Sequence, residues 1–420
     1  MEYLSKSDLE SLAIAHRLIR FHAIPLLYRN VTINTVQPRA YEKAKGLVET
    51  PYILKWVNAL VFSGPLLDSP STTNTEIFNN FVTSFSKMPN LRELKLVGIY
   101  LNLHAEMEIL ATPLMSFACD QCLFTSEQLT PALARQSSVT TLQLSLKEDA
   151  KFPDSPPTFL NNFLNVETLD ITVPYRDYTG SPRFPFLTSL IIRSPIDLGT
   201  VRTILRQSPL LAQLRYIHRH WRDEHNAPIK IPLLQHIEAP FSAVIQSLES
   251  PVLESIVILT RRGYGHNQCG SINHLLSAIK RGPGQQITSL DMTVWFQNRE
   301  QARELLVNLS DAVPNISRFT LRVDPFSSKA VLAGPLYNGR ARLPKLESLS
   351  VSIVLTGKQY HQPYVIPEDI LESFARVFLE TLVRPICPSL QVVRIFPWCD
   401  SITKTVLEGE GTMWKFERRD

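Results

Sequence analysis

Apolar residues recur along this chain in one short phrase, Leu-x-x-Leu-x-Leu, in which other large apolar residues can replace leucine. The clear copies are MPNLRELKL (88–96), FLNVETLDI (163–171), SPVLESIVI (250–258), VPNISRFTL (313–321) and LPKLESLSV (343–351). Weaker copies start at Val57, Leu114, Val139, Leu187, Leu211, Leu234, Ile287 and Leu390, which makes about thirteen irregular repeats. Such a repeat predicts stacked units, because one unit cannot bury its own apolar face.

The spacing within each copy predicts how a unit is built. The last two apolar residues alternate with polar ones, as Leu94 and Leu96 do, and this period of two indicates a strand buried on one face. The apolar residue before them, Leu91 in the same copy, marks the bend into the strand. Eight copies carry a proline two positions before that bend, and proline stops a preceding helix.

Stretches with helical spacing lie between the predicted strands. Residues 76–85 place five apolar side chains on one face: Ile77, Phe78, Phe81, Val82 and Phe85. Residues 271–281 do the same with Ile272, Leu275, Leu276 and Ile279. A further helix is predicted from Pro367 through Arg384. Strand, turn, helix and return predict an α/β solenoid with a parallel sheet.

This pattern resembles the leucine-rich repeat family over roughly residues 50 to 400. The resemblance implies an α/β fold, namely an irregular leucine-rich-repeat solenoid with parallel strands on the concave side and helices outside. In that family an Asn or Cys stands three residues after the last leucine and bonds the backbone of the turn. Here only Cys122, after Cys119, has that place, which makes the solenoid irregular.

Composition narrows the class of protein. Of the 420 residues 44% are hydrophobic, yet there is no run of about 18 apolar residues and no signal-peptide pattern, so no membrane span is expected. Five scattered cysteines favour a reducing compartment, hence the cytoplasm, the nucleus or both. A net charge of +4, with basic and acidic residues interleaved, weighs against nucleic-acid binding.

The first 33 residues have a different character and are predicted to be helical. Ser7-Asp8-Leu9-Glu10 has the form of a capping box, in which Ser7 and Glu10 satisfy the first N–H groups of a helix. A second short helix is predicted from Arg17 to about Ala23, ahead of Pro25.

Residues 3–33, YLSKSDLESLAIAHRLIRFHAIPLLYRNVTI, resemble the second half of an F-box. The match rests on Tyr3-Leu4, Asp8-Leu9, Leu12, Arg17, Arg20 and Pro25-Leu26-Leu27-Tyr28-Arg29, with Ile19 where the family has tryptophan. The resemblance implies that a Skp-type adaptor is bound by Tyr3, Leu4, Leu9, Leu12, Ile19 and Leu27. The family's opening Leu-Pro-x-Glu-Ile helix is not in the sequence, so a truncated start and a loss of adaptor binding both stay open.

A partial F-box (1–33) followed by leucine-rich repeats (34–420) resembles the substrate receptors of cullin-based ubiquitin ligases, a class abundant in fungi. The resemblance implies a non-catalytic protein without a cofactor, which holds an unknown protein substrate by strand side chains that point away from the core. Those side chains include Lys95, Asp170, Arg193, Arg215, Glu238, Asp291, Arg322 and Arg394. The alternative is a leucine-rich-repeat scaffold that binds a protein partner without any ligase.

Other motifs are weaker. WFQNR (295–299) copies part of a homeodomain helix but follows directly on a repeat strand. Cys119-x-x-Cys122 has the spacing of half a zinc site, and no second half follows. The loop 261–270 lacks the Gly-Lys-Ser/Thr ending of a phosphate loop. A polar cluster of metal-ligand residue types is interpreted as an exposed loop: His218, His220, Asp223, Glu224 and His225. No metal site and no enzyme are expected.

Overall fold

The computed structural model describes most of the chain as two compact units, residues 1–211 and 212–420. The described residues are 5–15, 17–37, 39–64, 72–124, 138–145, 163–172, 184–193, 198–217, 230–259, 268–294, 299–323, 342–353, 387–396, 399–407 and 411–417.

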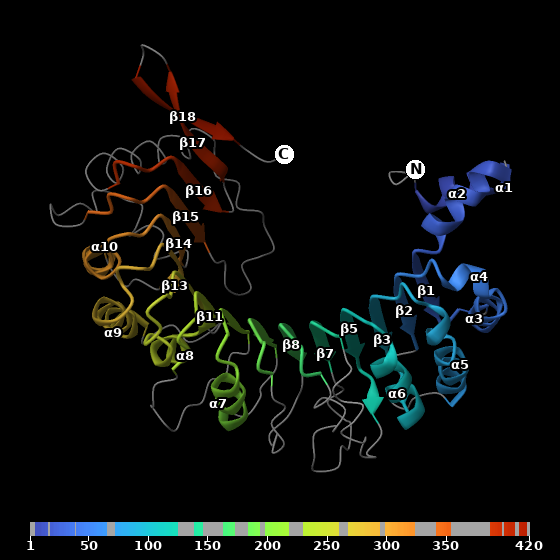
Figure 1. Ribbon diagram of the computed structural model, residues 1–420. Helices are drawn as coiled ribbons and strands as arrows, with labels where there is room; N and C mark the ends of the chain where they lie inside the picture. Colours follow the sequence, from blue (N-terminus) through green and yellow to red (C-terminus); the bar gives the residue numbers. More distant parts are fainter. Residues whose placement is uncertain are drawn as a thin grey trace, which may run out of the picture. The chain divides into compact units, whose positions relative to one another are not determined.

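The first unit contains a parallel sheet whose neighbouring strands follow one another in the sequence (Figure 1). The strands are β1 (Asn30–Asn34), β2 (Ala59–Ser63), β3 (Glu93–Val97), β5 (Ser116–Asp120), β7 (Thr141–Ser145), β8 (Thr168–Thr172) and β9 (Ser189–Ile192). A two-stranded parallel pair, β4 (Tyr100–Leu101) and β6 (Leu123–Phe124), lies beside the main sheet.

The helices of the first unit fall into an N-terminal pair and a set that follows the strands (Figure 1). The pair is α1 (Lys6–Ala15) and α2 (Arg17–Leu27). The others, with one 3-10 turn, are α3 (Ala40–Val48), α4 (Pro51–Leu54), α5 (Thr72–Val82), η1 (Phe85–Lys87), α6 (Leu103–Ala111) and α7 (Leu198–Gln207). The helices of this set cover one face of the sheet and leave the other open.

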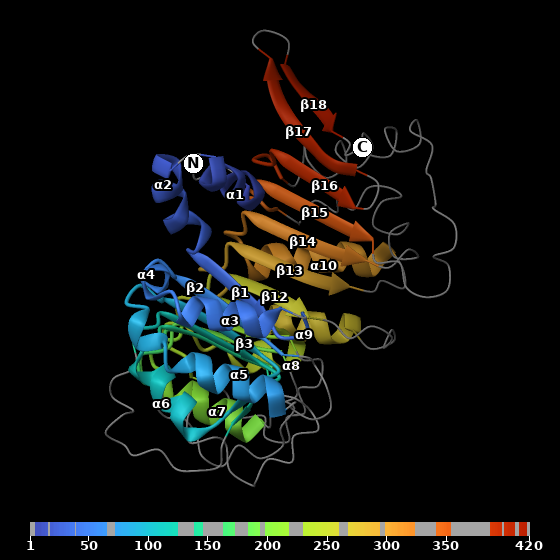
Figure 2. The same cartoon turned by 90° about the vertical axis from the view of Figure 1, so that its right-hand side faces the viewer.

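The second unit repeats this design and ends in a hairpin (Figure 2). Its parallel strands are β10 (Gln213–Tyr216), β11 (His236–Pro240), β12 (Ser255–Leu259), β13 (Ser289–Val294), β14 (Arg318–Val323), β15 (Ser348–Ile353) and β16 (Val392–Phe396). The hairpin of β17 (Cys399–Leu407) and β18 (Gly411–Glu417) pairs antiparallel to β16. The helices are α8 (Phe241–Gln246), α9 (Gln268–Arg281) and α10 (Arg299–Ala312).

All thirteen copies of the repeated phrase lead into a strand, and the strands pair in register. Equivalent apolar residues therefore lie side by side across the sheet of the first unit: Leu60, Leu94, Phe117, Leu142, Leu169 and Leu190. Each of these side chains is at most 1% exposed. A second row, in the second unit, contains Leu214, Ile237, Ile256, Leu290, Phe319 and Leu349. The predicted leucine-rich-repeat solenoid is confirmed.

The predicted apolar helix faces are buried as well. On α5 and η1, Phe78, Phe81 and Phe85 are at most 2% exposed, and the rings of Phe78 and Phe62 meet edge to face with centroids 5.1 Å apart. On α9, Leu275 and Ile279 are fully buried. These side chains fix the helices against the sheet, because the apolar stripe of each helix has no other surface to cover.

Local features at the N-terminus differ from those predicted. The capping pair is Ser5 and Asp8, not Ser7 and Glu10: the Asp8 N–H donates to Ser5 Oγ at 3.2 Å and the Ser5 N–H donates to Asp8 Oδ2 at 3.1 Å. The helix starts two residues earlier than predicted because this reciprocal pair already satisfies its first N–H groups.

The second N-terminal helix also continues past Pro25, where the sequence predicted its end. Proline removes one hydrogen bond of the last turn, and the Tyr28 N–H still donates to the Ile24 carbonyl at 3.1 Å. Strand β1, the β4–β6 pair and the C-terminal hairpin were not anticipated either. The predicted helix Pro367–Arg384, the His218–His225 cluster, and residues 261–267 and 295–298 lie outside the described residues.

Within the described residues, no helix has both the length and the apolar character needed to cross a bilayer.

Substitution of Leu169 by aspartate tests the strand register. Leu169 is fully buried, so we expect Leu169→Asp to lower the free energy of unfolding by at least about 3 kcal/mol. Thr141→Asp, on the exposed side of the neighbouring strand, should cost at most about 1 kcal/mol. Urea unfolding measures both variants. The reverse order would mean that the register is wrong by one residue.

Two glycines predict opposite effects of the same substitution. A Cβ at Gly284 would overlap the carbonyl oxygen of Ala312, a backbone atom of the next repeat, so Gly284→Ala should destabilise by roughly 1–3 kcal/mol. A Cβ at Gly46, within α3, meets nothing within 4 Å. Gly46→Ala should therefore stabilise by roughly 0.5–1 kcal/mol. Thermal unfolding of the two variants distinguishes them, and equal shifts would contradict the close contact at Gly284.

Candidate protein-interaction surface

The sheet face opposite the helices carries the polar residues that alternate with the buried ones. In the first unit, Asp170 on β8 and Arg193, directly after β9, form a two-pronged ion pair. Arg193 Nε donates to Asp170 Oδ1 at 2.9 Å, and Arg193 Nη2 donates to Asp170 Oδ2 at 2.8 Å. Lys95 on β3 is exposed on the same face. The sequence predicted these three side chains on the open face, and the structure additionally pairs two of them.

Two similar ion pairs lie on the open face of the second unit. Arg215 Nε donates to Glu238 Oε2 at 2.5 Å, from β10 to β11. Arg322 Nη2 donates to Asp291 Oδ2 at 2.6 Å, from β14 to β13. In each pair the acidic side chain is less than 20% exposed and the arginine is at least 40% exposed. The carboxylates therefore lie close to the surface of the sheet, and the guanidinium groups are more exposed to solvent.

The environment of Asp291 differs from that of an ordinary surface carboxylate. Burial raises the pKa of Asp291, and the nearby Glu238 carboxylate raises it further, while Arg322 lowers it. Its second oxygen, Oδ1, is buried without a hydrogen-bond partner. A negative charge at this place is held mainly by one guanidinium group, so the two residues act as a unit.

A histidine and a serine meet on the same face. His236 Nδ1 and Ser255 Oγ are 2.9 Å apart on the paired strands β11 and β12. Burial lowers the pKa of His236, and Arg215 lowers it further, against the effect of Glu238. A Ser–His contact alone does not make a nucleophilic site, because an acyl-transfer reaction also needs N–H donors for the oxyanion. The strand N–H groups here are used by the parallel ladder. The pair therefore provides polar contacts rather than catalysis.

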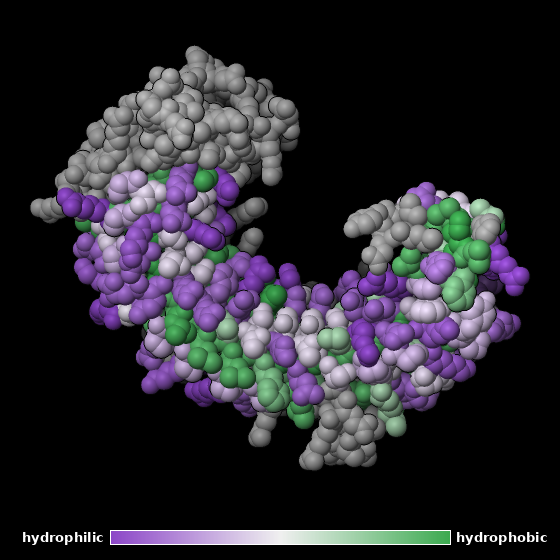
Figure 3. Space-filling view, turned by 45° about the horizontal axis from the view of Figure 1, so that its top comes forward, coloured by the Kyte–Doolittle hydropathy of each residue, from purple (hydrophilic) through white to green (hydrophobic). Residues whose placement is uncertain are grey.

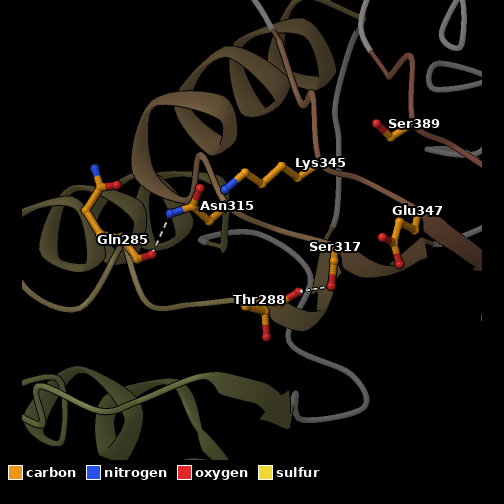
Figure 4. Close-up of a pocket in the computed structure, with 7 residues that line it drawn as sticks. All are labelled: Gln285, Thr288, Asn315, Ser317, Lys345, Glu347 and Ser389. Carbon is orange, nitrogen blue, oxygen red and sulfur yellow. Dashed lines mark hydrogen bonds between the residues drawn. The ribbon is translucent and has the colours of Figure 1, made fainter.

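A polar groove of about 470 Å³ lies in the second unit, along the edge where the parallel strands begin (Figure 4). Its lining comes from the loops that precede β13 to β16: Gln285, Thr288, Asn315, Ser317, Lys345, Glu347 and Ser389. Asn315 Nδ2 donates to the Gln285 carbonyl at 2.7 Å, and Ser317 Oγ donates to the Thr288 carbonyl at 3.2 Å. These bonds join one repeat to the next.

The amide bond in the groove is a repeated device. Asn90, at the equivalent place in the first unit, donates from Nδ2 to the Lys55 carbonyl at 2.6 Å. The amide of Asn315 is therefore explained by the joint between repeats, and the groove gives weaker evidence for a ligand than the open face does.

The N-terminal helices expose apolar side chains that the sequence interpretation missed. Ile14, Leu18 and Phe21 are 87%, 71% and 74% exposed. Apolar residues gather on these helices in Figure 3. The sequence signal for this surface is only the apolar character of the three residues, because the break between α1 and α2 interrupts the helical spacing.

The residues predicted to bind an adaptor lie elsewhere on these helices. Leu9 is 7% exposed. The side chains of Leu12, Ile19 and Leu27 are partly buried. Tyr3 and Leu4 lie outside the described residues. Leu9 therefore packs the helical pair, whereas Ile14 and Phe21 are available on its surface.

The cysteine pair of the first unit has a structural role. Cys119 and Cys122 are both buried, and Cys122 Sγ lies 3.6 Å from the Asp120 carbonyl, to which it donates. This is the bond to the turn backbone that the repeat resemblance implied. Burial raises the pKa of the Cys119 thiol well above its usual range. In the part of the chain that the structure describes, no group of three or more His, Cys, Asp or Glu could hold a metal ion.

Comparisons with known proteins give weak similarities. No family description matches the sequence, and no curated protein matches it. An internalin (inlF) of Listeria monocytogenes is 13% identical, with 77% of this chain and 91% of that chain covered and a TM-score of 0.40. A chain of the yeast Rad7 and Elc1 complex is 14% identical, with 94% of each chain covered and a TM-score of 0.34. Similarity at this level does not indicate a function. A proposal for the function therefore has to be based on the open face of the sheet and on the N-terminal helices.

Proposed function

We propose that this chain is a protein-interaction module and, more specifically, a substrate-recognition subunit of a cullin-type ubiquitin ligase. The N-terminal helices would bind a Skp-type adaptor, and the open face of the sheet would hold the protein to be ubiquitinated. Such a subunit performs no chemistry itself and requires no cofactor. It would act in the cytoplasm, the nucleus or both.

The observation that carries the proposal is the exposed apolar surface of α1 and α2. Ile14, Leu18 and Phe21 are each more than 70% exposed on a pair of helices whose buried residues are Leu9 and Ala23. Contiguous apolar surface on a folded protein is typical of a binding site. The same segment resembles the second half of an F-box, so an adaptor of the Skp type is the partner that both observations favour.

The polarity of the open face supports the second half of the proposal. Its ion pairs and hydroxyl groups are arranged on a rigid sheet, in which each strand is fixed by its neighbours. Rigid elements that present alternating polar side chains suit recognition of another protein, because few side chains need to be ordered on binding. A leucine-rich-repeat scaffold that works without a ligase would use the same face and would have no need of the adaptor.

Co-purification of the full chain with a Skp-type adaptor tests the proposal. We expect the unsubstituted chain to bind the adaptor and the double variant Ile14→Asp with Phe21→Asp to bind at least about tenfold more weakly. Both positions are exposed, so the variant should fold, whereas Leu9→Asp would place a charge at a buried position.

A matched control replaces two exposed tyrosines of neighbouring helices. Tyr41 on α3 and Tyr52 on α4 are 55% and 58% exposed, so Tyr41→Asp with Tyr52→Asp removes similar apolar surface and adds the same charge. This control should keep adaptor binding. No binding by the unsubstituted chain would mean that these two helices are not sufficient for an adaptor site and would favour the scaffold alternative.

A further inference from the structure

Three arginines surround one part of the open face in the second unit. Arg318 is the first residue of β14, Arg322 is the fifth, and Arg394 lies in the middle of β16. The strands β14, β15 and β16 are direct neighbours and lie side by side in Figure 2. Arg318 and Arg394 are exposed, and Arg322 is half-buried.

The register fixes how far apart these arginines are. Arg318 and Arg322 are four residues apart on one strand, which separates their Cα atoms by about 13 Å. Arg394 is aligned through Ser350 with Thr320, midway between them and two strands away. Strand spacing and rise together place Arg394 roughly 12 Å from each of the other two arginines. The three residues form a broad triangle.

The centre of the triangle carries hydroxyl groups. Thr320 on β14 and Ser348 and Ser350 on β15 point to the open face between the arginines, and all three are partly exposed. A hydroxyl group both donates and accepts, so this centre can satisfy the backbone and the side chains of a bound segment.

Among the described side chains, the three arginines outnumber the one carboxylate on this part of the open face, Asp291, and the exposed Glu347 lies at the edge of the sheet, directly before β15. Asp291 is taken by Arg322, as described above. Among the described residues Arg318 and Arg394 have no ion-pair partner. The net charge of these four residues is therefore +2: Arg318, Arg322, Arg394 and Asp291. The hydroxyl groups lie between the arginines. A ligand of opposite charge would gain both the attraction and the two-pronged hydrogen bonds that guanidinium groups form with carboxylates.

We propose that this triangle binds an extended, acidic segment of a partner protein, with carboxylates spaced along the segment. The proposal rests on the function given above, because it names the chemistry of the protein that the open face holds. The breadth of the triangle favours several spaced carboxylates over a single anion, since alternate side chains of an extended segment are about 6.6 Å apart and every fourth residue spans about 13 Å.

A nucleic acid fits the triangle less well. Single-stranded nucleic acids are bound by basic grooves with aromatic rings on which bases stack. Arg318, Arg322, Arg394, Asp291 and the three hydroxyl residues bring no aromatic ring to this part of the open face. The chain as a whole has a net charge of only +4.

Fluorescence anisotropy with the full chain tests the proposal. The probe is a labelled peptide of about twelve residues with glutamate at every second position and serine elsewhere, and the reference peptide has glutamine in place of glutamate. We expect the glutamate peptide to bind, the glutamine peptide to bind at least about tenfold more weakly, and added salt to weaken the former. Equal binding of the two peptides would overturn the proposal.

Substitutions locate the binding. Arg318→Gln with Arg394→Gln should weaken glutamate-peptide binding about tenfold, while the urea midpoint stays unchanged because both side chains are exposed. Arg322 is kept, since its removal would leave Asp291 unpaired. The matched control, Lys280→Gln with Arg281→Gln on α9, removes the same charge from the helix side and should change binding less than about twofold.

The remaining outcomes are decisive too. An unchanged affinity in the Arg318/Arg394 variant, or an equal loss in the α9 control, would overturn the proposal. So would tighter binding of single-stranded RNA of the same length with the same dependence on Arg318 and Arg394. If the chain bound the glutamate peptide but not the adaptor, the proposed adaptor site would be refuted and the acidic-segment site would stand. If it bound the adaptor but not the glutamate peptide, only the acidic-segment site would be refuted.

Discussion

The in-register pairing of parallel strands is the constraint on which the rest of this molecule depends. Each strand repeats the position of the one before it, so Leu94 meets Phe117 and Phe117 meets Leu142 in one buried row. The same pairing aligns the residues of the opposite face. A single register thus sets both the core and the recognition surface. A strand side chain lies on the open face when it is an odd number of residues away from a buried apolar residue of the same strand.

That dependence explains how much the sequence revealed. The alternation of residues such as Leu169 and Ile171 was enough to place Asp170 on the open face, because a period of two has only two outcomes. The ion pairs could not be read in the same way. Asp170 and Arg193 are 23 residues apart, whereas Asp291 and Arg322 are 31 apart, so partners are set by repeat length and register together.

Local competition accounts for the differences at the N-terminus. Ser5 and Ser7 each precede an acidic residue by three positions, and sequence spacing does not decide which serine caps the helix. Pro25 was read as a stop, yet a proline in the last turn costs only one hydrogen bond. The exposure of Ile14 and Phe21 depends on which side of each helix packs inward, and that is a property of tertiary contacts rather than of spacing.

The hairpin at the end of the second unit has a consequence for how such a chain can grow. Strand β17 runs antiparallel to β16, and β18 runs antiparallel to β17, so the stack of parallel repeats stops at β16 and is followed by a hairpin. Duplication of an internal unit, ahead of this hairpin, would lengthen the parallel part of the sheet. An inserted copy would widen the recognition face by one strand of about 4.8 Å while it left the terminal hairpin intact.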